Sequence, residues 1–158
     1  MSEAEDRSKS KEVRLEEKGK VEAETQRSLA VAEMKRAHKL IEEAEKARKR
    51  PVLQSVCLRI DVHIKLLTNA AQMYGKPPFT DHLLSDPTLD YISGLHQIYE
   101  SIRFDFQKNM EIKNEEMSIM FPKIELRTKD AYSVTASFAK MGQQLAQMHL
   151  YCQRILLG

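Results

Sequence analysis

The sequence contains little cysteine, glycine and proline for its length. Of its 158 residues, two are cysteine, five are glycine and five are proline. Two cysteines cannot form a disulfide framework, which favours a reducing compartment over secretion. The low glycine and proline content, together with 42% hydrophobic residues, excludes a collagen-like chain and a wholly disordered one.

Long apolar runs and a large net charge are also missing. No stretch approaches the roughly 20 apolar residues that a membrane helix requires, and residues 1–20 contain no apolar run typical of a targeting peptide. The net charge is only +2, with 25 basic and 23 acidic side chains, which argues against a chain built mainly to coat nucleic acid. We therefore expect a soluble intracellular protein without a membrane segment.

Charged and aromatic residues are distributed unevenly along the chain. Residues 1–50 hold 14 basic and 12 acidic side chains and no aromatic one, whereas all ten tyrosines and phenylalanines lie after Pro51. Because aromatic side chains supply much of the buried area of a core, the folded unit is expected after this proline. The three predicted parts are a disordered N-terminal tail over residues 1–20, a charged coiled-coil arm over 21–50 and a helical bundle over 52–158.

The arm is predicted to be a coiled-coil helix. From Val21 onward it is rich in the helix-favouring residues Ala, Glu, Lys, Arg and Leu. Small and apolar residues recur there at alternating steps of three and four, which is typical of a coiled-coil seam. The seam residues that we predict to bind partner helices are Ala30, Met34, Ala37 and Ile41. Because alanine makes this seam narrow, the arm helix is expected to need a partner.

Two basic clusters in the arm suggest a further role. Lys35 and Arg36 are separated by eleven residues from Arg48, Lys49 and Arg50, which is the spacing of a two-part nuclear import signal. The two clusters would bind two acidic pockets on an extended receptor. The alternative is that they are solvated charges of a helix, since glutamates occupy the spacer between them.

Three long helices are predicted in the bundle. Apolar residues recur at steps of three and four along each of them, which indicates amphipathic helices. The three segments are residues 53–74, 87–120 and 123–157. No alternating run bounded by hairpin turns is present. The predicted fold class is therefore all-α: an elongated bundle of three main helices with an N-terminal charged coiled-coil helix.

Turn and capping residues set the expected helix ends. Gly75 is expected as a left-handed C-terminal cap of the first helix. Asp86 is expected to cap the second, with Pro87 at its first position. Pro122 is expected to separate the second helix from the third.

The apolar stripes also predict the core and a shared seam. The core residues are expected to be Ile60, Ile64, Leu67, Tyr99, Ile102, Phe106, Phe138, Leu145 and Ile155. A helix over residues 53–74 cannot cover two helices half as long again. Either the arm helix continues across Pro51, or another chain covers the remainder. The bundle residues predicted to form such an interaction seam are Ile102, Phe106, Met141, Leu145 and Met148.

No pattern of residues indicates catalysis or a cofactor. The five histidines lack the spacings of zinc or di-iron sites, and only His96 and Glu100 could share a ligand face. Cys57 and Cys152 occupy apolar stripes and are interpreted as buried residues; a link between the first and last helices is the alternative if they are neighbours. We expect no enzymatic activity, no cofactor, no metal and no small-molecule substrate.

The predicted function is that of a non-enzymatic helical interaction module. It would be a scaffold or adaptor subunit that forms homo- or hetero-oligomers with partner helices through heptad seams. The alternative is a nucleic-acid or chromatin-associated factor that binds through the basic cluster at the end of the arm. The interleaved acidic residues count against this alternative, whereas the basic clusters slightly favour the nucleus over the cytoplasm.

Overall fold

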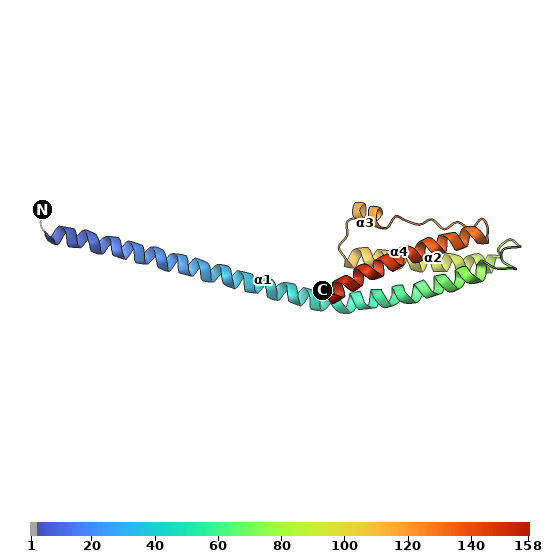
Figure 1. Cartoon of the computed structure of the whole chain (residues 1–158), viewed down its shortest axis with the longest axis horizontal. Coiled ribbons are helices and arrows are strands. Elements are labelled where there is room, and N and C mark those ends of the chain that lie inside the picture. Colours follow the sequence, from blue (N-terminus) through green and yellow to red (C-terminus); the bar gives the residue numbers. More distant parts are fainter. Residues whose placement is uncertain (1–2) are drawn as a thin grey trace. The chain divides into compact units, whose positions relative to one another are not determined.

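The chain consists of helices and irregular connections, as the computed structural model in Figure 1 shows. The structure describes residues 3–158, with side chains from Val13 onward. The helices are α1 (Glu3–Tyr74), α2 (Asp86–Asn109), α3 (Asn114–Met120) and α4 (Ala131–Leu157). No strand occurs within the described residues, and the predicted all-α fold class is confirmed.

The chain divides into two units, Met1–Ala47 and Arg48–Gly158. The first unit contains only the N-terminal part of α1, and every side chain described in it is exposed. The second contains the remainder of α1 and the other three helices. All buried residues of the described chain lie in this second unit, beginning at Leu53.

Helix α1 starts earlier than expected and continues through Pro51. Residues 3–20 are helical, which differs from the disordered tail predicted for residues 1–20; Met1 and Ser2 lie outside the described residues. The segment is rich in Glu, Lys and Arg, which favour helices, and its one glycine costs only about 1 kcal/mol relative to alanine. Continuation across Pro51 was one of the two predicted alternatives.

The bundle is formed by residues 48–74 of α1 together with α2 and α4, which lie side by side in Figure 1. Its core is continuous from Val56 to Cys152. Phe106, near the C-terminal end of α2, is fully buried and makes edge-to-face contacts to Phe121 at 5.5 Å and to Tyr151 at 5.7 Å between ring centroids. These helices supply the buried area that stabilises the unit.

The predicted helix lengths for the bundle are wrong. Helix α2 has 24 residues and α4 has 27, so both match residues 48–74 of α1 in length. At 1.5 Å per residue they span about 36 Å and about 40 Å, and the bundle is elongated. No long stretch of α2 or α4 therefore extends beyond α1, and no uncovered part of these helices requires a partner chain there.

Two irregular segments account for the shorter helices. The first separates α2 from α3 and contains Glu111, whose φ of 56° is in the left-handed region. The second covers residues 121–130, predicted in large part as helix, and we call it the connector. Asp130 ends the connector because its side chain accepts a hydrogen bond from Ser133 N at 2.7 Å and caps α4.

The helix caps expected at Gly75 and Asp86 differ from those in the structure. Gly75 ends α1 but has no positive φ. A Cβ atom there would lie 2.9 Å from Ala71 O, so glycine is required by close approach rather than by left-handed geometry. The cap of α2 is Ser85, whose side chain accepts from Thr88 N at 3.4 Å. Asp86 is instead the first helical residue.

Most of the predicted core residues are buried. Seven of the nine are at most 1% exposed: Ile60, Leu67, Tyr99, Ile102, Phe106, Phe138 and Leu145. Ile64 is partly buried against the core. Ile155 is 47% exposed, so its assignment to the core is wrong. None of the helices within residues 3–158 carries an apolar stretch long enough to span a bilayer.

Candidate interaction surfaces and the polar network of the bundle

The first candidate surface is an apolar face on the N-terminal part of α1. It comprises the seam residues predicted from the sequence and the larger residues beside them, and we call it the arm face. Its members are Ala23, Ala30, Val31, Met34, Ala37, Leu40, Ile41 and Ala44. At 100° per residue the four alanines, Met34 and Ile41 lie within about 80° of one another, and Val31 and Leu40 lie at the two opposite edges of this face. Met34 is 60% exposed, Leu40 66% and Ile41 56%.

The predicted seam residues of the bundle are placed differently. They are at most 1% exposed, within the core that α1, α2 and α4 form among themselves. The residues in question are Ile102, Phe106, Met141, Leu145 and Met148. A side chain that this chain's own helices enclose does not present a surface to a partner. The structure therefore assigns these five residues to the core of the unit.

The basic residues of the predicted import signal are all exposed on α1. Lys35 and Arg36 lie on the arm, and Arg48 and Arg50 lie at the start of the bundle unit. Lys49 is paired with Glu111, with 2.9 Å between Nζ and Oε1. Because both partners are exposed, this ion pair contributes at most about 1 kcal/mol.

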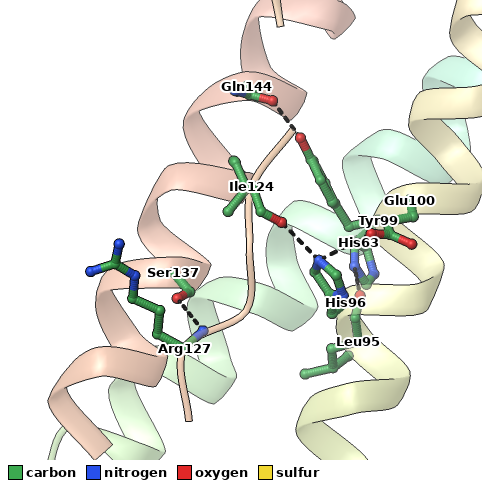
Figure 2. A network of polar contacts seen from close by, with 9 residues as sticks. All are labelled: His63, Leu95, His96, Tyr99, Glu100, Ile124, Arg127, Ser137 and Gln144. Carbon is green, nitrogen blue, oxygen red and sulfur yellow. Dashed lines mark hydrogen bonds and ion pairs between the residues drawn. The ribbon is translucent and has the colours of Figure 1, made fainter. Parts of the chain in front are cut away.

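The connector is held on the bundle by side chains of α2 and α4 (Figure 2). His96 donates a hydrogen bond from Nε2 to Ile124 O at 2.9 Å. Gln144 on α4 donates to Pro122 O at 2.8 Å and accepts a hydrogen bond from the hydroxyl of Tyr99. The amide of Gln144 thus links the two helices and the connector.

Two further contacts complete the attachment of the connector. Arg103 on α2 donates from both Nε and Nη2 to Phe121 O, at 3.1 Å and 2.7 Å. The hydroxyl of Ser137, which is 5% exposed, accepts from Arg127 N at 3.2 Å. The sequence analysis did not identify Arg103 or Gln144. Arg103 follows Tyr99 by four residues, so its position on the buried face of α2 could have been recognised.

Burial in the core shifts the pKa values of Tyr99 and His63. Burial raises the pKa of Tyr99 to about 12 and lowers that of His63. His63 is 2% exposed, and its Nε2 donates to Leu95 O at 2.9 Å. Its Nδ1 has no hydrogen-bond partner within the described chain. The ring is therefore neutral, with the proton on Nε2.

The two cysteines are buried, as expected, and their thiols are neighbours. Burial raises the pKa of Cys57, and raises that of Cys152 to about 12. The two thiols, one on α1 and the other on α4, are close enough to influence each other's ionisation. Both are free thiols, and thiols with raised pKa values are poor nucleophiles and poor metal ligands.

Potential metal ligands are scattered in the described part of the chain. No three His, Cys, Asp or Glu side chains gather there as metal ligands would. His96 and Glu100 are 3.4 Å apart, but His96 Nε2 also contacts the connector. Comparison of the chain with protein-family models, with curated proteins and with solved structures found no match.

Proposed function

We propose that this chain is a non-enzymatic helical interaction module, a scaffold or adaptor subunit that binds partner helices through the arm face. One observation carries the proposal. The side chains from residue 13 to residue 47 are all exposed, yet they include Met34 and Ile41 on the side of the helix that carries the alanine stripe, with Val31 and Leu40 at its two edges. Exposed apolar patches of this kind are typical of protein interaction sites.

Physical chemistry supports a helical partner for this face. A helix in water gains most of its stability from packing of its apolar face against other elements, not from intrinsic propensity. The arm face lacks such packing within its own unit. Alanine recurs every seven residues at positions 23, 30, 37 and 44, and small side chains allow a second helix to approach closely. The partner is a second copy or a helix of another protein.

A pair of matched substitutions in the full chain tests the proposal. Ala37→Glu introduces a charge in the arm face, whereas Ala32→Glu introduces the same charge about 140° around the helix. The two changes have the same small effect on helix propensity. Because burial of an unpaired carboxylate in an interface is costly, we expect Ala37→Glu to weaken association at least about tenfold. Ala32→Glu should leave association unchanged.

Sedimentation equilibrium over a range of concentrations measures self-association of the chain and both variants. If the chain is monomeric throughout, the proteins that co-purify from cells with the Ala37→Glu variant are compared quantitatively with those bound by the Ala32→Glu variant. Selective loss with Ala37→Glu in either experiment supports the proposal. Equal behaviour of the two variants in both experiments would rule out the arm face as the binding surface.

The alternative is a nucleic-acid or chromatin-associated factor, favoured by the exposed side chains of Lys46, Arg48 and Arg50. This alternative includes the nuclear import signal and a nuclear location. Binding to phosphates releases counterions, so affinity for duplex DNA would fall by orders of magnitude between low and moderate salt. Fluorescence anisotropy of a labelled duplex measures this dependence. The neighbouring glutamates 42, 43 and 45 lead us to expect no such binding.

A further inference from the structure

Arg103 on α2 is a buried cation without an acidic partner. Its side chain is 8% exposed, and it takes part in none of the ion pairs of the described residues. Its hydrogen bonds, from Nε and Nη2, both end on the neutral carbonyl of Phe121. A buried charge that lacks a countercharge is unfavourable. An anion bound beside Arg103 would therefore supply the missing countercharge.

The hydrogen bonds of Arg103 leave one edge of its guanidinium free. A guanidinium carries five N–H donors in a fixed plane. The contact with Phe121 uses the edge formed by Nε and Nη2, so the end formed by Nη1 and the second N–H of Nη2 has no partner among the described residues. This end matches the two oxygens of a carboxylate, which arginine binds with two parallel hydrogen bonds.

A groove lies beside this arginine, between α2 and the segment that carries α3. Its volume is about 680 Å³, within the usual range of small-ligand sites. Lys108 and Lys123 line the groove together with Glu100 and Glu111. With Arg103 the lining carries one net positive charge. That balance suits a singly charged carboxylate better than a phosphate dianion.

The same groove offers apolar surface for the remainder of a ligand. Phe104 forms part of its wall and is 63% exposed, an unusual position for a phenylalanine. Ile112 and Ile124 lie along the other side. A flat apolar or aromatic group bound there would cover Phe104 and remove it from water.

We propose that this groove binds an organic carboxylate with an apolar body. The carboxylate pairs end-on with the free edge of Arg103, and the body packs on Phe104. Such a group is supplied either by a small organic acid or by the C-terminal residue of a polypeptide. The site lies wholly in the unit Arg48–Gly158 and does not depend on the arm face.

Titration of the full chain with 3-phenylpropionate tests the site, followed by backbone amide shifts in NMR spectra. We expect saturable shifts that cluster in residues 99–124, with a dissociation constant in the millimolar range, as befits a ligand of this size. The neutral analogue 3-phenylpropanamide should give no saturable shifts, because it lacks the charge that Arg103 recognises. Inorganic phosphate should bind more weakly than the carboxylate.

Two variants separate recognition from stability. Arg103→Lys keeps the charge but removes the two-donor edge, and we expect it to weaken binding about tenfold. Phe104→Ala changes an exposed side chain, so it should leave the fold intact and weaken binding several-fold. Lys140→Gln, outside the groove, is the matched surface control and should bind as the unmodified chain does. Thermal unfolding of each variant verifies that it is folded.

Two peptide probes distinguish the sources of the carboxylate. An acetylated tripeptide that ends in phenylalanine is compared with its C-terminal amide and with 3-phenylpropionate. If the free-acid peptide binds more tightly than 3-phenylpropionate, the groove is assigned to a polypeptide C-terminus. If 3-phenylpropionate binds and the free-acid peptide does not, the groove is assigned to a small acid. Absence of saturable shifts with every carboxylate, equal binding of acid and amide, or unchanged affinity in both Arg103→Lys and Phe104→Ala would overturn the proposal.

Discussion

At the scale of single residues, His63 shows how burial selects a protonation state. The imidazole fills space in the core between α1 and α2, with Nε2 bound to Leu95 O and Nδ1 without a partner in the described chain. Protonation would place an unpaired N–H and a charge inside the core, which is costly. The lowered pKa of His63 expresses this cost.

The first prediction is that His63 makes the stability of the bundle fall in mild acid. In the unfolded chain the histidine pKa is about 6.5, and in the folded chain it is lower. Between these two values the unfolded state binds more protons, so the free energy of unfolding rises with pH there. As the pH falls below about 6.5, the free energy of unfolding therefore decreases, by at most about 1.4 kcal/mol per pH unit.

Urea unfolding of the chain and of a His63→Gln variant, at about pH 7.5 and about pH 5.5, measures this contribution. Glutamine can still donate to Leu95 O but does not titrate. We expect the free energy of unfolding to drop less between the two pH values in the variant. Equal drops would show that His63 is not the group responsible. His82, exposed in the loop after α1, provides a control through His82→Gln.

Residue burial could largely be inferred from periodicity, with one instructive failure. Tyr99, Phe106 and Phe138 occupy stripes of steps three and four, and all three are buried. Such a stripe has a period of 3.5 residues, whereas a straight α-helix has 3.6, so the stripe drifts by about 20° per heptad. Over the length of α4 this drift carries Ile155 off the core face, and Leu156 packs there in part instead.

At the scale of elements, the connector and not a helix closes one side of the bundle. Its backbone is irregular, so its carbonyl groups need partners from outside the segment. Gln144 serves two of the groups involved, because it donates to Pro122 O and accepts from the buried hydroxyl of Tyr99 (Figure 2). A single side chain therefore couples α2, α4 and the connector.

The second prediction concerns this coupling. Gln144→Ala leaves the hydroxyl of Tyr99 without a partner in a site where the ring is fully buried. An unsatisfied buried polar group costs about 1–3 kcal/mol, and we expect the free energy of unfolding to fall by this amount. Gln143→Ala removes the neighbouring glutamine, which is exposed, and should change it by less than about 0.5 kcal/mol.

Urea-induced unfolding of both variants at neutral pH gives the comparison. A loss shared equally by Gln143→Ala and Gln144→Ala would attribute the effect to helix propensity rather than to the network. No loss in Gln144→Ala would show that water replaces the amide at Tyr99.

The existence of the elements could be predicted, whereas several of their ends could not. The sequence around Glu111 contains neither glycine nor proline, and the apolar rhythm continues to Met117, so nothing local marks the end of α2. The break is stabilised by Gln107, whose side chain donates to Ile112 O at 3.1 Å and to Asn114 Oδ1 at 2.6 Å. The sequence analysis placed the start of the last helix at residue 123 and did not identify Asp130 as the cap of α4.

At the scale of the whole chain, the two units differ in what stabilises them. The unit Arg48–Gly158 contains the entire hydrophobic core of the described residues. The preceding residues contribute a helix whose described side chains are all exposed. The predicted core and arm face follow from composition, since all aromatic residues lie after Pro51. The groove beside Arg103 could not be predicted, because it depends on where the connector folds back.

The third prediction is that a chain beginning at Arg48 folds as stably as the full chain. No residue before Leu53 is buried among those described, so removal of the arm deletes no packing from the core. We expect the temperature of cooperative unfolding, measured by circular dichroism at low protein concentration, to change by less than about 2 °C. The full chain should also lose part of its helical signal gradually below this transition, because an unpacked helix is only marginally stable in water.

The concentration dependence of the same measurement links stability to the proposed function. If the arm face binds a second copy, the gradual loss of helical signal in the full chain should shift to higher temperature as its concentration rises, since association stabilises the bound state. The Ala37→Glu variant should abolish that shift, and the Ala32→Glu variant should retain it. A several-degree decrease of the cooperative transition in the shortened chain would instead show that the arm stabilises the bundle directly.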